Sequence, residues 1–219
     1  MCGRFAQIAL ADFLKGFDLH DFSFDIGVHY NIAPTQDITV LIMRDRIIPE
    51  TMRWGLIPSW SKDESIGSKM INARGETVTE KPSFRSALKK RRCIIPADGF
   101  YEWRQMTAGK QPYFIRLKSQ ETFCFAGLFE SWQSPTGEKI NTCTIITTTP
   151  NSVLEPIHNR MPVIIPKSQY GVWLNIETPT AVVLGLLVPY PSDEMEAYEV
   201  STLVNSPKND IPACIQPKQ

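Results

Sequence analysis

The sequence is poor in the residue patterns that build metal sites and crosslinks. Its 219 residues include five cysteines and three histidines, and none of these stands in a C-x-x-C, H-E-x-x-H or H-x-x-E-H spacing. Such spacings are typical of zinc sites, so we expect neither a metal nor another cofactor. The odd number of cysteines favours free thiols in a reducing compartment over disulfide bonds.

Long apolar runs and an excess of one charge are lacking as well. The longest apolar run, residues 181–188, is far shorter than the roughly 20 residues that span a membrane. No basic region followed by an apolar core marks an export signal, so we expect a soluble cytoplasmic protein without a membrane partner. The 23 basic and 23 acidic side chains give no net charge, which excludes a uniformly basic nucleic-acid coat protein.

Proline is abundant, and its 17 residues predict many short extended segments and few long helices. Apolar residues at helical spacing predict four short helices, at 10–17, 82–90, 167–174 and 180–187. Strands are predicted between residues 30 and 60, in runs cut by Pro34, Pro49 and Pro58, and then at 92–96, 99–104, 112–118, 122–130 and 140–148. Turn signals lie at 108–109 and 135–137. Strands in the middle and helices at the edges indicate an α+β fold with a mostly antiparallel sheet, in one domain of residues 1–219.

Positive charge is concentrated between residues 81 and 118, where ten basic and two acidic side chains give a local charge of +8. One interpretation is structural, because the basic residues 89–92 would suit the C-terminus of the predicted helix. The other is a groove that binds phosphates. Aromatic residues interleave with these charges, and such a mixture suits single-stranded nucleic acid, whose bases stack on aromatic rings.

The first residues suggest unusual chemistry. Methionine aminopeptidase usually removes Met1 when the second residue is small, which would leave Cys2 with a free α-amine beside its thiol. Such an aminothiol condenses with an aldehyde to an imine, which the thiol then traps as a five-membered thiazolidine. The amine has an ordinary pKa of about 7.7–8.0, so part of it is unprotonated near neutral pH. The alternative is that a cysteine follows Met1 by accident.

Two further side chains are candidates for proton transfer. Glu102 stands within a run of glycine and aromatic residues, where apolar neighbours would raise the pKa of its carboxyl and keep it protonated. His158 lies in a loop-like stretch between two prolines, and imidazole suits proton shuttling near pH 7. An outward-facing glutamate and a structural histidine are the alternatives.

Asn72 and Arg74 are two residues apart, so on an extended segment they would face the same way. Asn72 could then orient a substrate hydroxyl, and Arg74 could hold a phosphate through two hydrogen bonds. The alternative is that this stretch forms a turn and a helix cap.

Together these segments resemble one known family. The motifs appear in order along nearly the whole chain, from residue 2 to about 212, at 2–5, 30–34, 54–60, 72–74, 92–103, 158–162 and 204–210. Their residues are CGRF, YNIAP, WGLIPSW, NAR, RCIIPADGFYEW, HNRMP and VNSPKND. On these motifs the chain resembles the SOS-response-associated peptidase (SRAP) family of abasic-site processing proteins. Gly75 departs slightly, since many members carry another small residue there.

The resemblance implies a single domain with a barrel-like β-sheet core flanked by short helices. It implies that the protein binds single-stranded DNA and couples covalently to abasic sites through the mature Cys2, shielding them during the DNA damage response. It also implies self-processing at Met1, which underlies the peptidase name, weak lyase activity by β-elimination, and association with the nucleoid when DNA is bound.

The same resemblance assigns roles to single residues. Glu102 is expected to act as acid and base, His158 to assist proton transfer, and Asn72 to position the sugar or the Cys2 amine. The expected DNA contacts are six side chains: Arg4, Arg74 and Arg85 for phosphates, and Trp54, Trp60 and Trp103 near the strand. We also expect Met1, where it is retained, to lie beside Glu102 and His158.

Two rival hypotheses remain open. An N-terminal-cysteine amidotransferase or hydrolase also begins Met-Cys-Gly, but it usually places an apolar residue where Arg4 stands, and this sequence contains no Asn-Gly dipeptide. A non-catalytic single-strand binder would use the basic segment alone, and replacement of Cys2 by alanine would leave its function intact.

Overall fold

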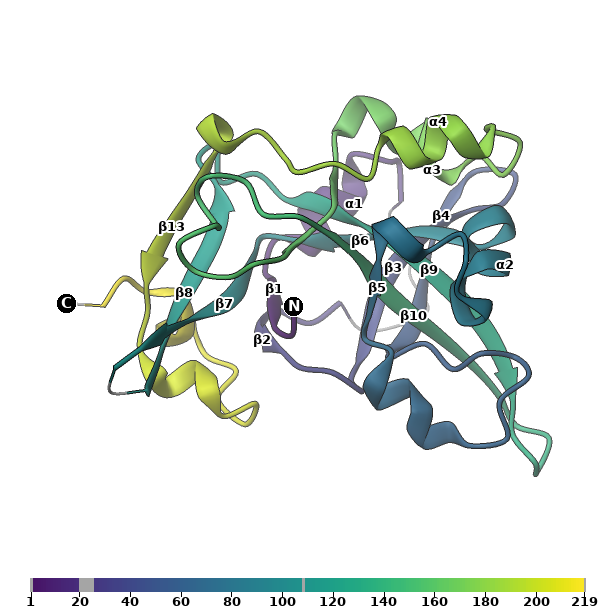
Figure 1. Cartoon of the computed structure of the whole chain (residues 1–219), viewed down its shortest axis with the longest axis horizontal. Helices are drawn as coiled ribbons and strands as arrows, with labels where there is room; N and C mark the ends of the chain where they lie inside the picture. Colours follow the sequence, from purple (N-terminus) through teal and green to yellow (C-terminus); the bar gives the residue numbers. More distant parts are fainter. Residues whose placement is uncertain (1, 20–25, 108, 219) are drawn as a thin grey trace.

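Two β-sheets form most of the regular structure (Figure 1). The computed structural model describes residues 2–19, 26–107 and 109–218. The larger sheet contains β3 (Asp37–Met43), β4 (Ile47–Trp54), β5 (Asn72–Arg74), β6 (Arg92–Ala97), β9 (Phe123–Gln133), β10 (Lys139–Thr148), β11 (Met161–Pro162) and β12 (Ile164–Ile165). The smaller sheet has the order β13 (Met195–Glu199), β8 (Gly109–Leu117), β7 (Gly99–Met106), β1 (Phe5–Gln7) and β2 (His29–Ile32).

The larger sheet closes on itself. Its strands run in the order β10-β4-β3-β6-β9, and β9 pairs again with β10 from Gln133 to Gly127. These five strands therefore close into a barrel. The contacts of β10 with β4 and β5 are parallel, and the other pairings in the two sheets are antiparallel. The predicted α+β class and the mostly antiparallel, barrel-like core are confirmed.

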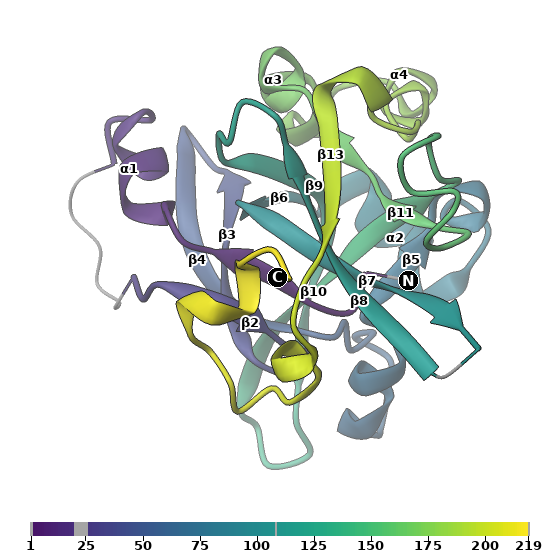
Figure 2. The same cartoon turned by 90° about the vertical axis from the view of Figure 1, so that its left-hand side faces the viewer.

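Short helices lie at the edges of the sheets (Figure 2). The α-helices are α1 (Leu10–Lys15), α2 (Pro82–Lys90), α3 (Tyr170–Leu174) and α4 (Thr180–Gly185). In the part of the chain that the structure describes, six 3₁₀ helices accompany them: η1 (Glu64–Lys69), η2 (Gly75–Thr77), η3 (Lys167–Gln169), η4 (Ser192–Glu194), η5 (Thr202–Asn205) and η6 (Pro212–Ile215). All four predicted helices are present.

The predicted strands are present as well, with one correction at Pro49. This proline does not interrupt a run but lies inside β4, where it pairs with Leu41 of β3. On the other side, β10 pairs only with Arg53 and Trp54 at the end of β4. The strand therefore has an open edge at Pro49, a position at which proline is tolerated. The predicted turn at 135–137 joins β9 to β10, and the predicted turn at 108–109 falls partly outside the described residues.

Two large apolar clusters hold the layers together. One lies between the two sheets and contains Cys2, Phe5 and Trp54 from opposite sides. The rings of Phe5 and Trp54 meet edge to face at 5.2 Å, which contributes about 0.5–1.5 kcal/mol beyond burial alone. The other cluster joins the outside of the barrel to α2, α3 and α4. The N-terminal segment is thus anchored at the interface of the sheets.

Five free cysteines, all buried, match the thiols expected from the odd count. Among the described residues, no helix is long and apolar enough to cross a membrane. Within the same residues, no group of three or more histidine, cysteine, aspartate or glutamate side chains could hold a metal ion.

Candidate functional site

Strand pairing places Cys2 beside Glu102. β1 pairs with β7 so that Phe5 lies opposite Phe100, and the Tyr101 amide donates to the Arg4 carbonyl at 3.0 Å, so the residues before β1 continue along β7 toward Glu102. The Cys2 side chain is fully buried between the sheets. Its burial, together with the charge of the Glu102 carboxylate, raises the pKa of the thiol. The sulfur and the carboxyl group therefore share one poorly solvated corner.

Glu102 and His158 come together from different sheets. Glu102 is only 2% exposed, and burial raises the pKa of its carboxyl, an effect that the nearby His158 opposes. His158 Nδ1 lies 3.9 Å from Glu102 Oε1. His158 stands in the loop between β10 and β11, where the amide of Arg160 donates a hydrogen bond of 3.0 Å to Nδ1. The pair can exchange a proton with a bound molecule.

Asn72 faces the same apolar cluster as Cys2. β5 runs parallel to β10 with Asn72 beside Ile145, and paired residues of neighbouring strands point to the same side. Ile145 belongs to the cluster that contains Cys2, and Ile71 packs against it. Asn72 Nδ2 donates to the Ile71 carbonyl at 3.0 Å. Its buried Oδ1 accepts no hydrogen bond from the described residues. Such an orphaned acceptor is available to a hydroxyl or amine of a ligand.

Arg74 begins a cationic edge next to this corner. It is exposed on the same face of β5 as Asn72. Arg160 forms a two-pronged ion pair with Glu76 and also donates to the Thr147 carbonyl at 2.6 Å. Arg160 chiefly, and Arg74 to a smaller extent, hold the pKa of the Glu76 carboxyl below its usual range. The guanidinium groups of Arg160 and Arg74 therefore both lie close to the Glu76 carboxylate.

A cavity of about 530 Å³ opens at this place, which lies within the roughly 300–1,000 Å³ of typical ligand pockets. Its lining consists of Glu102, Trp103, Lys110, His158 and Asn205. The residues that the sequence marked for proton transfer thus line a pocket, and Cys2 lies close enough to Glu102 for their charges to interact.

Two predicted DNA contacts instead hold the protein together. Trp54 is fully buried and donates its Nε1 proton to the Ile71 carbonyl at 2.9 Å, so no base can stack on its ring in this conformation. The Arg4 guanidinium donates to Asn31 Oδ1 (2.8 Å) and to the carbonyls of Val204 (2.8 Å) and Asn205 (3.2 Å). Three of the five N–H donors of Arg4 are thus bonded to protein oxygens.

The remaining predicted contacts differ in position. Trp103 is partly buried and lines the pocket. Trp60, in the loop after β4, is 60% exposed, and Arg85 is exposed on α2; neither lines the pocket. Both are available to a long ligand at the surface.

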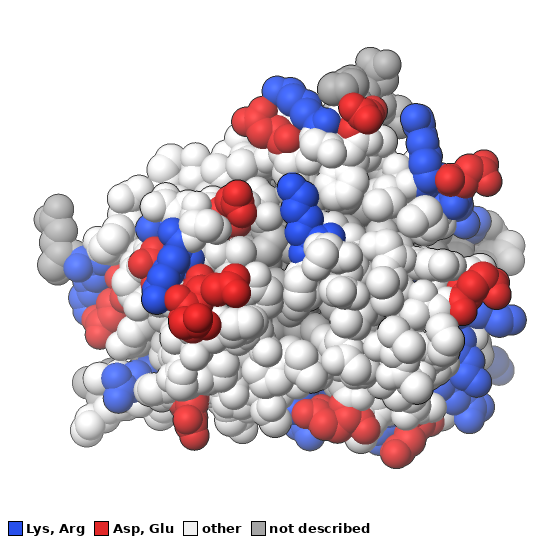
Figure 3. Space-filling model, turned by 90° about the horizontal axis from the view of Figure 1, so that it is seen from above, with Lys and Arg blue, Asp and Glu red and all other residues white. Residues whose placement is uncertain are grey.

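The basic segment does not form one groove. Arg92 is buried and donates to backbone carbonyls, including that of Trp173. Arg91 and Arg116 are paired with acidic partners. On the face shown in Figure 3, basic and acidic side chains alternate around a largely uncharged surface. Of the basic side chains in this segment, Lys110 lines the pocket.

Three residues at the site received no individual role from the sequence. Lys110 was only one charge of the basic segment, while Arg160 and Asn205 stood inside motifs whose other members were assigned. The signal for Asn205 was its place in the VNSPKND motif near the C-terminus. The predicted position of Met1 beside Glu102 and His158 falls outside the described residues.

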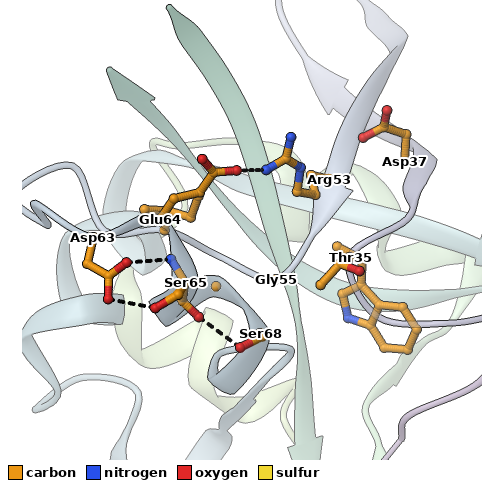
Figure 4. Close-up of a pocket in the computed structure, with 11 residues that line it drawn as sticks. Thr35, Asp37, Arg53, Gly55, Asp63, Glu64, Ser65 and Ser68 are labelled. Atoms are coloured by element: carbon orange, nitrogen blue, oxygen red, sulfur yellow. Dashed lines mark hydrogen bonds and ion pairs between the residues drawn. The ribbon is translucent and has the colours of Figure 1, made fainter. Parts of the chain in front are cut away.

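A second cavity of about 580 Å³ lies at the end of β4, under η1 (Figure 4). Gly55 and Gly67 cross closely there, and Gly55 adopts a φ of +132° that favours glycine. The polar groups of this cavity bond to one another: Arg53 pairs with Glu64, and Asp63 accepts from Ser65. This cavity is slightly larger, and Trp54 is part of its lining, but neither Glu102 nor His158 is.

Comparisons with known proteins agree with this architecture. The family model described as "SOS response associated peptidase (SRAP)" matches residues 1–207. The abasic site processing protein YoqW of Bacillus subtilis is 50% identical, with 99% of each chain covered. The abasic site processing protein HMCES of Gallus gallus is 34% identical over 86% of this chain and 66% of its own length.

A solved structure from Bacteroides thetaiotaomicron has a TM-score of 0.88 at 31% identity, with both chains covered completely. Another from Bordetella bronchiseptica has a TM-score of 0.79 at 26% identity and covers 91% of this chain and 100% of its own. The chain therefore belongs to the SOS response associated peptidase (SRAP) family, as its motifs indicated.

Proposed function

We propose that this protein binds single-stranded DNA and forms a covalent thiazolidine crosslink with abasic sites through Cys2 as its mature N-terminus. The observation that carries the proposal is the convergence of Cys2 with Glu102 and His158 beside a pocket. The names of the relatives, abasic site processing proteins, support the choice of substrate. An abasic deoxyribose opens to an aldehyde, which is the electrophile that an aminothiol requires.

The chemistry needs no external oxidant or reductant. Hydrolysis of the Met1–Cys2 peptide bond consumes one water and frees the Cys2 amine. The amine adds to the sugar aldehyde and releases water as the imine forms. The sulfur then bonds to the imine carbon, and the thiol proton passes to the nitrogen, which closes a five-membered ring. Burial and the charge of Glu102 raise the pKa of the thiol, so its proton has to be transferred as the sulfur bonds to the imine carbon.

Each polar residue has a task in this scheme. Glu102, protonated at a higher pH than usual, donates to the ring oxygen when the sugar opens, and as carboxylate takes a proton from the amine. His158, whose Nδ1 lies 3.9 Å from Glu102 Oε1, assists proton transfer through a bridging water or a hydroxyl of the substrate. Asn72 offers its orphaned oxygen to the sugar hydroxyl or to the amine.

The strand is proposed to run over the exposed cations and rings around the pocket. Arg74 at the rim and Arg85 on α2 contact phosphates, while Trp103 and Trp60 contact bases. Arg4 and Trp54 act indirectly, by fixing the segments around the pocket. The imine stage also permits β-elimination, so weak lyase activity accompanies crosslinking, and Met1 removal accounts for the peptidase of the family name.

The test combines mature protein with single-stranded DNA that contains one abasic site, followed by a denaturing gel. We expect a heat-resistant shifted band whose mass equals protein without Met1 plus DNA minus one water. Intact mass of the untreated protein verifies that Cys2 is the first residue. Matched duplex DNA and the Cys2→Ala variant serve as controls and should yield no band.

The outcome separates the rival hypotheses. Absence of the band with a verified N-terminal Cys2 would contradict the proposal. Glutaminase or other amide hydrolysis lost in Cys2→Ala would favour the amidotransferase class, and DNA binding without crosslinking would favour a non-catalytic binder.

A further inference from the structure

The VNSPKND motif near the C-terminus has no task in the chemistry above, yet it forms part of the pocket wall. Asn31 of β2 donates its side-chain amide to three carbonyls of this segment, those of Val204, Ser206 and Asn209. The Asp210 carboxylate accepts a hydrogen bond of 2.9 Å from the backbone N–H of Asn31. Together with Arg4, these contacts clamp residues 204–210 against β1 and β2. The segment is thereby held in one place.

Asn205 is the residue of this clamped segment that reaches the pocket. Its Oδ1 accepts a hydrogen bond of 2.8 Å from Trp103 Nε1. Arg4 holds its carbonyl at 3.2 Å, so the acceptor is itself fixed. An indole ring can rotate about two torsions, and one hydrogen bond at its nitrogen selects a single orientation of the ring plane. Asn205 therefore fixes how Trp103 faces the cavity.

Lys110 stands next to Trp103 on the same side of the β7–β8 hairpin. Trp103 pairs with Pro112, and Lys110 is two residues from Pro112, so its side chain projects on the same face. Lys110 lines the pocket, is exposed, and has no hydrogen bond or ion pair with any described residue. A cation, an oriented aromatic ring and an amide thus line the cavity together with Glu102 and His158.

We propose that Lys110, Trp103 and Asn205 form a subsite for a nucleotide adjacent to the abasic residue. Lys110 binds its phosphodiester, its base stacks on Trp103, and Asn205 acts as the positioning residue that holds the indole plane. Aromatic stacking combined with a positive charge is the usual means of holding single strands without sequence preference. This inference rests on the proposed function, since it names the neighbour of the same substrate.

The first experiment measures affinity for intact single-stranded DNA, which cannot crosslink, over a range of salt concentrations. Lys110→Gln should weaken binding roughly three- to tenfold and reduce the salt slope by about 0.7, the value for one phosphate contact on a single strand. The matched control is Lys118→Gln, at the far end of β8, whose ammonium bonds to the Asp193 carbonyl. Equal affinities and slopes for the two variants would overturn the phosphate assignment.

Shortened strands locate the subsite. In oligonucleotides cut back one nucleotide at a time from either side of the abasic position, the effect of Lys110→Gln should vanish when the nucleotide on one side is removed. The effect of Arg74→Gln should persist in that same oligonucleotide. If both effects vanish together, Lys110 and Arg74 serve the same nucleotide and the separate subsite is refuted.

The second experiment is a double-mutant cycle between Asn205→Leu and Trp103→Phe, read by the fluorescence of 2-aminopurine placed beside the abasic position. Asn205→Leu should reduce the quenching that follows binding, and it should add nothing in the Trp103→Phe background, where no indole N–H remains. Additive effects would refute the positioning role. Circular dichroism verifies that the variants are folded.

The two levels of the proposal fail separately. If the unmodified protein binds abasic DNA without crosslinking, the proposed function fails, while the affinity and fluorescence data still decide the subsite. If crosslinking is normal and Lys110→Gln behaves like Lys118→Gln, the subsite fails and the proposed function stands.

Discussion

The molecule contains two cavities of similar volume whose polar groups differ in ion pairing and in the direction of their pKa shifts. In the cavity under η1, of about 580 Å³, Arg53 and Glu64 pair with each other at 33% and 50% exposure. Hydrogen bonds from Ser65 hold the pKa of Asp63 below its usual range. In the pocket beside Cys2, of about 530 Å³, burial instead raises the pKa of Glu102.

The difference shows that volume does not identify a site in this fold. Surface ion pairs and capped carboxylates satisfy themselves and keep their ordinary charge. A carboxyl whose pKa is raised by burial, next to a thiol and an imidazole, marks a candidate functional site. The state of the titratable groups therefore distinguishes the candidate site from the cavity under η1.

The largest expected effect is the loss of the crosslink when the proposed nucleophile, Cys2, is replaced. Cys2→Ala removes the sulfur and should abolish the heat-resistant crosslink to abasic single-stranded DNA in the gel assay. Ser65→Ala, which alters the cavity under η1, should leave the amount of crosslink unchanged. Retention of the band in Cys2→Ala would show that another nucleophile is used.

The next effect concerns the two carboxylates. Glu102→Gln should slow crosslink formation by roughly 10²–10⁴-fold, the usual contribution of a positioned acid or base. Glu64→Gln should leave the rate unchanged, because its carboxylate contacts Arg53 outside the pocket. Single-turnover time courses with quenched samples measure both rates. Equal rates for the two variants would remove Glu102 from the mechanism.

The titration of Glu102 should also make the free energy of unfolding depend on pH. Since burial raises its pKa, folding favours the protonated form, and the contribution of this group to the free energy of unfolding is full below the unfolded pKa of about 4.3. That contribution is lost as the pH rises through the raised pKa. Glu102→Gln cannot ionise, so its stability relative to the unmodified protein should increase over the same rise and then level off. Denaturant unfolding at a series of pH values tests this, and a constant difference would contradict it.

A smaller effect on DNA affinity should distinguish the arginines that contact the strand from one that does not. Arg74→Gln should weaken binding of single-stranded DNA roughly three- to tenfold and lower the salt slope by about 0.7. Arg85→Gln, on α2 away from the pocket, should have a weaker effect of the same kind. Arg53→Gln is the control under η1 and should have none. Salt-dependent fluorescence anisotropy measures all three, and an equal loss for Arg53→Gln would mean that the strand also crosses η1.

The smallest effect is on the stability of the cavity under η1. Replacing both members of the Arg53–Glu64 pair by glutamine should change the free energy of unfolding by about 0–1 kcal/mol, as expected for exposed ion pairs. Crosslinking should be unaffected. Chemical denaturation measures the change, and a loss of several kcal/mol would indicate a structural role for this cavity.

Much of the fold could be predicted because local patterns decide it. The helix at Pro82–Lys90 and the strands from Arg92 to Thr148 follow from the spacing of apolar residues and from turn signals. The short strands β1, β11 and β13 do not follow from the sequence, because segments of two to five residues carry too little pattern. Barrel closure was implied only by the family resemblance, since the pairing of β9 with both β6 and β10 joins segments far apart in the chain.

The candidate site divides in the same way. Residue chemistry alone singles out Cys2, Glu102 and His158, because an N-terminal aminothiol, a carboxylate among aromatics and a loop histidine each suggest a reaction. The fates of Arg4 and Trp54 could not be read from the sequence. Their partners are the Val204 carbonyl, 200 positions away from Arg4, and the Ile71 carbonyl, 17 positions from Trp54.

By itself, then, the sequence determined the candidate reactive groups of this protein, its helices and longer strands, and its family. The tertiary structure alone decided which cations remain open to a ligand, which tryptophans belong to the core, and that Asn205 reaches Trp103 across 102 positions. The physical reason is that reactivity and secondary structure depend on near neighbours along the chain. Exposure and hydrogen-bond partners depend on segments that meet only when the two sheets pack.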